Sequence, residues 1–377
     1  MDPDDVLQVI EGLCYVVSAL PTEQADPVLT AMLQPIAAAL MHAFPPAESA
    51  GPAAPDSGLI VLHFDRLATV MRHVAHPELV AGVFRELWPV VARGLERCGD
   101  RDERAAEHIC RCIKYAFRTS RYRLTDLVAP AAALYTQMFA RRQHASLLFA
   151  VSELVRSFGR DESCFETLRV SLEEVMSWTS KILRELSNFD AAPDVADDAF
   201  LLAKVCVSHC PSVVINIRVL PAVIDMALAG LHVQHREACC SMLIFLRNML
   251  QARDEGSVGV LRQVLPPRGE ALVRALLGGA LGSLPTARLE DVTDALAAML
   301  ACAGSAAVAW VAAAVRRIPE HAASAADTAA FMAVVTACGE GAGHVRALGR
   351  SLDELSELCR RSRRTRDSVQ AALAAAP

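Results

Sequence analysis

The sequence predicts an all-α protein, a solenoid of stacked helix pairs, and three observations lead to this prediction. Apolar residues make up 53% of the 377-residue chain and aromatic residues only 5%, while the helix formers alanine and leucine dominate. Helical periodicity recurs almost everywhere, with breaks roughly every 15 to 25 residues. Runs of β-branched residues bounded by Asn-Gly or Asp-Gly turns are absent from the sequence, so no β-hairpin is predicted.

The periodic segments define the expected helices. They span residues 4–19, 26–43, 58–75, 79–96, 103–118, 124–139, 144–158, 162–187, 194–209, 212–230, 236–252, 257–281, 287–302, 305–317, 323–338 and 341–361. Read as consecutive pairs, they recur at a spacing of roughly 36 to 54 residues, around the HEAT/armadillo period. Such pairs bury their apolar faces only by stacking, which builds a superhelix with a concave inner surface.

We therefore expect one solenoid of about eight helix pairs over residues 1–361, followed by a frayed or partly helical tail over residues 362–377. The rival architecture is a compact helical bundle, which the short loops between repeated pairs disfavour. Residues 45–58, with the sequence PPAESAGPAAPDSG, are expected to form an inter-repeat loop.

Charge and cysteine content limit the class of protein. The net charge of −6 argues against a general nucleic-acid binder, which would carry a broad basic field. Met1 is followed by acidic residues rather than by a signal peptide, so the twelve scattered cysteines are expected to be reduced core residues of a cytosolic or nuclear protein. Neither the Cys110/Cys112 pair nor the Cys239/Cys240 pair has the spacing of zinc ligands, and no metal or cofactor is predicted.

The stretch 295–315 carries no charge and is long enough to span a bilayer. About half of its residues are alanine, which is nearly neutral on transfer scales, and its central Ala-Gly-Ser favours a turn between two helices. The sequence therefore predicts two soluble helices here and no membrane span.

Catalytic motifs are missing from the sequence: it has no Gly-rich phosphate loop, no G-x-S-x-G and no H-E-x-x-H. The eleven histidines are dispersed; His209 is expected at a helix end, and His232 and His235 flank a helix start. Asp197 and Asp198 are expected to be a solvated first turn rather than a metal-binding pair, because adjacent carboxylates on a helix point apart. An enzyme is therefore not predicted.

One helix carries a candidate binding surface, in the segment RAAEHICRCIKYAFR at residues 104–118. At 100° per residue, five basic side chains fall within one arc of roughly 120°, and apolar side chains fill the opposite arc. We call these five residues the basic ridge: Arg104, His108, Arg111, Lys114 and Arg118. Arg121 and Arg123 extend the positive charge beyond the expected end of the helix.

A row of arginines one turn apart suits an extended acidic or phosphorylated peptide, because each guanidinium can donate two parallel hydrogen bonds to a carboxylate or phosphate. The alternative is a solvated charged face. It is weakened because Glu107 is the ridge's only acidic neighbour at i±3 or i±4. An exposed ridge also predicts that changing Arg104, Arg111 and Arg118 together to alanine leaves stability largely unchanged.

Several further segments resemble a known family in order and spacing. They are FDRLATVMRHV at 64–74 with HPELVAGVFRELWPVV at 76–91, the ridge segment, PDVADDAFLLAKVCVSHCPSVVI at 193–215 and HREACCSMLIFLRNML at 235–250. Together they resemble the importin-β superfamily of nuclear transport receptors, in particular the transportin-SR group, which imports serine/arginine-rich splicing factors. The resemblance runs from residue 4 to about residue 320.

The resemblance implies a HEAT solenoid that shuttles between cytoplasm and nucleus, wraps cargo in its arch and releases it when Ran-GTP binds. It implies that the basic ridge lines the inner surface and grips serine/arginine-rich cargo, with nucleoporins as further candidate partners and no direct contact with nucleic acid or membrane. His108 and Lys114 stand where the family has arginine, which favours a weaker grip on phosphoserine or a different cargo.

The family's receptors are more than twice as long as this chain, and the resemblance covers their C-terminal portion. The N-terminal repeats, which carry the main Ran contacts in the family, have no counterpart in the sequence. The chain is then either a fragment or a shortened protein. The alternative function is a generic HEAT scaffold or adaptor without a transport role; a receptor requires the basic ridge to face the concave side.

Overall fold

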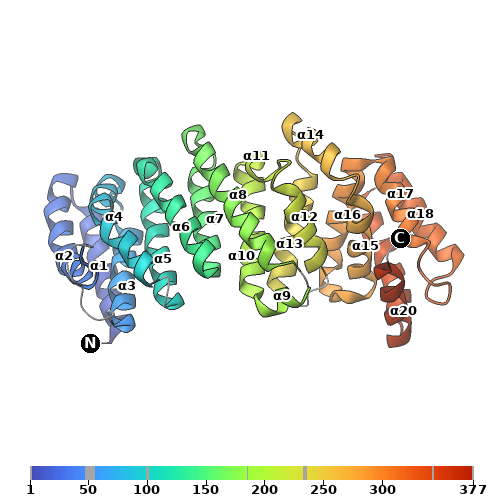
Figure 1. Ribbon diagram of the computed structural model, residues 1–377, viewed down its shortest axis with the longest axis horizontal. Helices are drawn as coiled ribbons and strands as arrows, with labels where there is room; N and C mark the ends of the chain where they lie inside the picture. The colour runs from blue at the N-terminus through green and yellow to red at the C-terminus, as the bar shows by residue number, and fades with distance from the viewer. Residues whose placement is uncertain are drawn as a thin grey trace. The chain divides into compact units, whose positions relative to one another are not determined.

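The computed structural model describes residues 2–46, 56–98, 102–184, 186–231, 236–341 and 344–375, and within these ranges every regular element is a helix (Figure 1). The predicted all-α fold is confirmed. By its internal contacts the chain divides into two units, Met1–Val175 and Met176–Pro377, with the boundary inside α8 (Phe165–Ile182). Each unit is described by itself.

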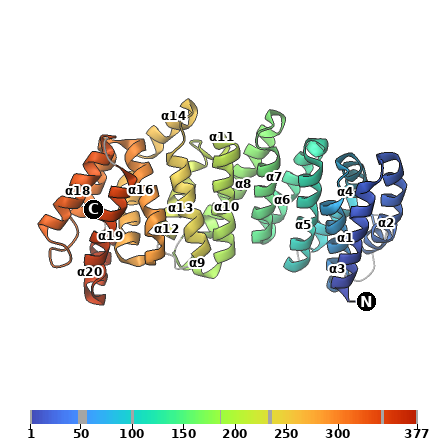
Figure 2. The same cartoon turned by 180° about the vertical axis from the view of Figure 1, so that it is seen from behind.

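The first unit consists of successive helices arranged in two rows. Its elements are α1 (Pro3–Ala19), α2 (Thr22–Ala43), α3 (Ser57–His73), α4 (Pro77–Cys98), α5 (Glu103–Ser120), the 3-10 helix η1 (Arg121–Leu127), α6 (Val128–Arg142), α7 (Ala145–Phe158), the 3-10 helix η2 (Glu162–Cys164) and the start of α8. Helices α1, α3, α5 and α7 pack in order along one row, and α2, α4 and α6 along the other (Figures 1 and 2). Contacts are more extensive within the first row. The row of α1, α3, α5 and α7 is therefore the more closely packed of the two.

The pairing of helices differs from the prediction. Within the first unit α4 packs on α5, α6 on α7 and α2 on α3, whereas α3 and α5 make few contacts with the helices that follow them. The predicted pairing is therefore shifted by one helix. This applies to the pairs predicted at 58–75 with 79–96 and at 103–118 with 124–139. The spacing of breaks along a sequence determines the period of a repeat but not which neighbour shares its core.

The second unit contains shorter and more irregular helices. They are α9 (Leu186–Ala191), α10 (Pro193–His209), α11 (Pro211–Val214), α12 (Leu220–Gly230), α13 (Arg236–Leu250), α14 (Glu255–Val264), α15 (Gly269–Gly278), the π-helical turn η3 (Gly279–Ser283), the 3-10 helix η4 (Thr286–Arg288), α16 (Leu289–Ala303), α17 (Ser305–Val315), α18 (Ala325–Gly339), α19 (Val345–Arg360) and α20 (Arg363–Ala374). Helices α10, α13, α16 and α19 form one closely packed row, while α15, α17 and α18 follow one another on the other side.

Three helices expected to be continuous are broken. The helix predicted at 162–187 begins as η2 and ends at Ile182. The helix predicted at 212–230 is interrupted at Asn216, whose side-chain oxygen accepts hydrogen bonds from the backbone amides of Arg218 and Val219 at 2.9 and 3.0 Å. The helix predicted at 257–281 is interrupted between α14 and α15, where Pro266 and Pro267 lack the amide hydrogen that a helix needs.

The C-terminal tail at 362–377, expected to be frayed or partly helical, contains a regular helix, α20. Thr365, Val369 and Leu373 are buried along one face of α20, which packs against α15. The backbone carbonyl of Ala375 accepts hydrogen bonds from Arg274 at 3.1 Å and from Arg317 at 2.7 Å. The helix propensity of the tail's residues underestimates the stability of α20, because burial against the rest of the unit supplies most of it.

The uncharged stretch 295–315 folds as two helices, as predicted. α16 ends at Ala303, α17 begins at Ser305, and Gly304 between them has φ of +52°, a conformation that glycine adopts without strain. Within the described ranges no helix has the length and apolar character needed to cross a membrane. Most of the predicted loop 45–58, and both His232 and His235, lie outside the described residues.

Candidate functional site on helix α5

Helix α5 is held firmly between its neighbours. Its first turn is capped by Asp102, whose carboxylate accepts a hydrogen bond from the backbone amide of Ala105 at 3.0 Å and another from the Ser57 hydroxyl of α3. On the core side, the Phe117 ring packs edge-on against Phe84 of α4 at 6.3 Å and against a phenylalanine of α7. The helix therefore presents a fixed outer face to solvent.

All five residues of the basic ridge lie on this outer face, opposite the buried core side. Arg104 is exposed, and the side chains of Arg111 and Arg118 are 38% and 43% exposed. The side chains of His108 and Lys114 are half-buried between α5 and its row neighbours. The helical projection of the sequence thus placed the ridge on the face that the structure leaves open.

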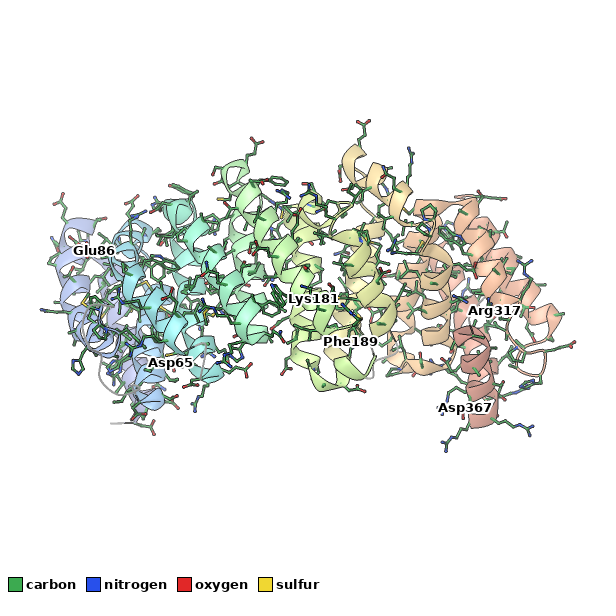
Figure 3. The ribbon with its side chains drawn as sticks, in the orientation of Figure 1. Asp65, Glu86, Lys181, Phe189, Arg317 and Asp367 are labelled. Carbon is green, nitrogen blue, oxygen red and sulfur yellow. The ribbon has the colours of Figure 1, made fainter. Side chains whose placement is uncertain are left out.

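The first neighbour, α3, contributes a carboxylate to the ridge. Asp65, labelled in Figure 3, places Oδ1 at 2.5 Å from Nδ1 of His108 and at 3.7 Å from Nη1 of Arg111. Arg111 also donates from Nη2 to Oε1 of Glu107 on its own helix at 2.9 Å. The centre of the ridge is therefore a charge network and not a bare row of cations.

The second neighbour, α7, holds the C-terminal end of the ridge. Arg118 donates from Nε to Oε2 of Glu153 at 2.6 Å, and its Nη2 lies at 2.5 Å from the same oxygen. The Glu153 side chain is only 4% exposed, and Arg156 lies at 3.6 Å from its other oxygen. One buried carboxylate thus orients two guanidinium groups at the surface.

Aromatic rings lie between these cations. The Lys114 ammonium lies 4.5 Å from the centre of the Tyr115 ring and 5.3 Å from that of Phe149 on α7. From α3, the Arg72 guanidinium lies 5.3 Å from the Tyr115 ring. These contacts make Arg72 a further member of the surface that the sequence analysis missed.

Glu107 is the ridge's only acidic partner three or four positions away on α5, as expected. Two further carboxylates, those of Asp65 and Glu153, reach the ridge from the neighbouring helices. The surface across α3, α5 and α7 still carries an excess of cations. Its permanent cations are Arg72, Arg104, Arg111, Lys114, Arg118 and Arg156, and its carboxylates are Asp65, Glu107 and Glu153. We call this set the α5 surface.

Arg121 and Arg123 follow α5, and only Arg121 is exposed. Arg121 has φ of +49°, where the chain turns from α5 into η1. Arg123 points toward α4, where its Nη2 donates to Oε1 of Glu78 at 2.7 Å. Arg123 therefore does not join the α5 surface, contrary to the sequence-based expectation.

The cysteines and the Asp197/Asp198 pair, which the sequence analysis also considered, do not form a metal-binding site in the described structure. Within the described ranges no group of histidine, cysteine and acidic side chains could hold a metal ion, and the twelve cysteines are free thiols. Burial raises the pKa of Cys110 to about 12, so this thiol is inert at neutral pH. The predicted solvated turn at Asp197 and Asp198 is corrected: burial, together with Asp197 and Asp194, raises the pKa of Asp198 to about 7.

Comparison with known proteins gives a consistent family assignment. Residues 76–183, which include all of α5, match the fourth TPR domain of transportin-3/importin-13. The chain is 32% identical to transportin MOS14 of Arabidopsis thaliana over 374 residues, which is 98% of this chain and 38% of that protein. It is 23% identical to an uncharacterized protein of Schizosaccharomyces pombe over 257 residues, 66% of this chain and 26% of that protein.

The fold agrees with this assignment. A structure of importin-13 in its cytosolic state superposes with a TM-score of 0.78 and 17% identity, covering 96% of this chain and 41% of that one. The chain spans less than half the length of these proteins. The order of sequence motifs, the relatives and the helical-repeat fold agree, and the chain belongs to the importin-β family.

Proposed function

We propose that this chain is the cargo-binding portion of a nuclear transport receptor, and that the α5 surface binds extended serine/arginine-rich segments of the cargo. One observation carries the proposal: an excess of exposed cations lies on the more closely packed row of the first unit. Arg104, Arg111 and Arg118 recur every seven residues on one helix face, which suits an extended anionic ligand.

The mixture of charges refines the ligand class. A phosphorylated serine/arginine segment alternates negative phosphates with positive guanidinium groups. The phosphates can bind Arg104 and the outward N–H groups of Arg111, while the exposed carboxylate of Glu107 can accept the arginines of the cargo. Because Arg118 is held through Nε and Nη2 by Glu153, it offers mainly Nη1 to a ligand. A surface of alternating sign thus complements a peptide of alternating sign and discriminates against a purely acidic one.

The aromatic groups add to the proposed binding. The Lys114 ammonium lies close to the rings of both Tyr115 and Phe149, and the Arg72 guanidinium also lies over Tyr115. Such contacts restrict the motion of the cations before the ligand arrives, which lowers the entropy cost of binding. We infer that Lys114 substitutes for an arginine by charge alone, because an ammonium lacks the planar fork of a guanidinium.

The wider transport role concerns regions that the relatives have beyond the part this chain matches. We propose that Ran-GTP releases the cargo, that nucleoporins guide the receptor through the pore, and that the protein shuttles between cytoplasm and nucleus. The support is the family membership and the similarity to transportin MOS14 and importin-13. The proposed role is one of binding, without a catalysed reaction.

The test is binding of a fluorescent Arg-Ser repeat peptide, phosphorylated or not, followed by anisotropy. We expect the double variant Arg104→Ala/Arg111→Ala to weaken binding of the phosphorylated peptide by about tenfold or more, since each lost charge-assisted hydrogen bond contributes about 1.5–3 kcal/mol. Arg118 is left in place because Glu153 depends on it. Added salt should weaken wild-type binding in the same direction.

The matched control is Arg141→Ala/Arg363→Ala, which removes the same charge at exposed positions outside the α5 surface. Both double variants should keep the wild-type circular dichroism spectrum and melting curve. Equal affinity of wild type and Arg104→Ala/Arg111→Ala for the phosphorylated peptide would reject the proposed ligand and favour the scaffold or adaptor role.

A further inference from the structure

The second unit contains an apolar groove. It lies between α14 and the turn that joins α16 to α17, and has a volume of about 460 Å³. That volume accommodates one or two large apolar side chains of a ligand. Its lining comprises Val258, Leu261 and Leu265 of α14 and its end, Ala301 and Cys302 of α16, and Trp310 of α17, with alanines between them.

The groove is open because of how its walls are built. Pro266 and Pro267 end α14 and let it diverge from α15, so that α14 stands at the upper edge of its unit in both views (Figures 1 and 2). On the other wall, Gly304 turns the chain sharply between two alanine-rich helix ends, which contribute little side-chain volume. The groove is therefore a product of chain geometry at two identifiable breaks.

The floor of the groove is rigid. The Trp310 ring lies against the backbone of Gly269, where a Cβ atom would come within 2.3 Å of the ring. This close contact fixes the ring in one position at the start of α15. A ligand would thus meet a preformed aromatic surface, which lowers the entropy cost of binding.

Two arginines border the groove without an acidic partner. Arg253 and Arg262 are exposed and line the cavity, and neither forms an ion pair with a carboxylate in the part of the chain that the structure describes. Arg253 is oriented by hydrogen bonds from Nη1 to the carbonyls of Leu250 and Ala252 at 3.1 and 3.0 Å. Elsewhere in this unit, by contrast, Arg247 and Arg268 are each paired with an aspartate.

We propose that this groove docks an acidic amphipathic helix of a partner protein. Leucine-sized anchors at helical spacing would occupy the cavity against Trp310, and carboxylates flanking those anchors would pair with Arg253 and Arg262. The charge of the rim selects this occupant, because a neutral apolar segment would leave both guanidinium groups without partners and a basic segment would be repelled. The site uses none of the residues of the α5 surface, so it stands independently of the proposed cargo binding.

Cys302 offers a direct probe of occupancy. Its thiol lines the groove and is half-buried, as are those of Cys240 and Cys338, which do not line it. The 377-residue chain is alkylated with a maleimide, and the rate at each of these three cysteines is followed by peptide mass spectrometry. The probe is a short amphipathic peptide with leucines three and four residues apart and glutamates between them. We expect it to slow alkylation of Cys302 severalfold and to leave Cys240 and Cys338 unchanged.

The charge requirement is tested with two further peptides, in which lysine or glutamine replaces each glutamate. We expect neither to protect Cys302 at the concentration at which the acidic peptide does. Protection by the neutral peptide to the same extent would overturn the assignment of an acidic partner. No protection by any peptide would overturn the docking site itself.

Variants then connect protection to affinity. Arg253→Ala/Arg262→Ala should weaken binding of the labelled acidic peptide by about tenfold, as should Ala306→Leu, which fills the groove from an exposed position. The matched control is Arg316→Ala/Arg346→Ala, which removes two exposed arginines that do not line the groove. Wild-type affinity in both groove variants would reject the proposal, and the control variant reports any general effect of lowered positive charge.

Discussion

Arg118 of α5 and Glu153 of α7 form an ion pair in which the carboxylate is only 4% exposed while the guanidinium is 43% exposed. Glu153 depends on Arg118 more than Arg118 depends on Glu153, because a buried ionised carboxylate without a cation would have nothing to compensate for its lost hydration. Arg156 lies 3.6 Å from the same carboxylate and shares this role. The pair links two neighbouring helices of the more closely packed row and orients cations at the surface at the same time.

This relationship revises the expected effect of mutating the basic ridge. We expect Arg118→Ala to lower the free energy of unfolding by about 1–2 kcal/mol, below the cost of breaking a fully buried pair because Arg156 remains and the site is partly solvated. Arg104→Ala, at an exposed position, should change it by less than about 0.5 kcal/mol. Urea denaturation followed by circular dichroism measures both. Equal stability of the two variants would show that Glu153 does not need Arg118.

Asp65 competes with any anionic ligand for the centre of the α5 surface. Its carboxylate lies 2.5 Å from Nδ1 of His108 and 3.7 Å from Nη1 of Arg111. If the surface binds phosphorylated peptides, Asp65→Asn should tighten that binding by about threefold, because one repulsive charge is removed and Arg111 is released. Anisotropy measures the affinity, with Asp353→Asn, at an exposed position on α19, as the control. A weakened affinity would mean that Asp65 positions the ridge rather than competing with the ligand.

Asp198 should make stability depend on pH near neutrality. Burial beside Asp197 and Asp194 raises the pKa of Asp198 from 3.8 to about 7 in the folded chain. Between these values the folded chain binds more protons than the unfolded chain, so the stabilisation present at low pH is lost as pH rises toward and through 7. Asp198→Asn should therefore raise the free energy of unfolding at pH 8 by an amount on the order of 2 kcal/mol.

The measurement is urea denaturation of wild type and Asp198→Asn at pH values of about 5.5 and 8, within the window in which other carboxylates stay ionised. The gain from the substitution should be larger at the higher pH. Asp353→Asn, exposed on another helix of the same unit, provides the reference for a generic loss of negative charge. A gain that is the same at both pH values would exclude titration of Asp198 as its cause.

Two glycines of the second unit should respond to alanine in opposite directions. At Gly269 a Cβ atom would lie 2.3 Å from the Trp310 ring, and a rigid indole cannot move aside cheaply, so Gly269→Ala should destabilise the chain by about 2 kcal/mol or more. At Gly259, inside α14, a Cβ atom would meet nothing within 4 Å. Gly259→Ala should stabilise the chain by about 0.5–1 kcal/mol, because alanine loses less backbone freedom on forming a helix.

Thermal melting of both variants measures the contrast. Because Trp310 also forms the floor of the apolar groove, Gly269→Ala should change its fluorescence spectrum while Gly259→Ala leaves that spectrum unaltered. If Gly269→Ala melted at the wild-type temperature with an unchanged spectrum, the close contact of Trp310 with the backbone would be disproved.

The positions of most helices could be predicted from the sequence because periodicity and breakers are local signals. The prediction that the stretch 295–315 is two helices depended on Gly304 and its small neighbours, and the chain turns there. The sequence missed the interruption at Asn216, whose side chain accepts hydrogen bonds from the backbone in place of a continuous helix. It left the tail open between a frayed and a partly helical end, because α20 is stabilised by packing against α15 and not by a local signal.

For the α5 surface, the sequence by itself determined which side chains share a face of the helix, since a fixed angle per residue decides that without knowledge of any neighbour. Only the tertiary structure decided what they meet. Asp65 lies 46 residues before Arg111 and Glu153 lies 35 residues after Arg118, and both carboxylates reach the surface only through the packing of α3 and α7 against α5. The apolar groove likewise required the divergence of α14 from α15. Periodicity reports the geometry within one helix, whereas charge balance and cavities depend on distances between helices, which a sequence does not contain.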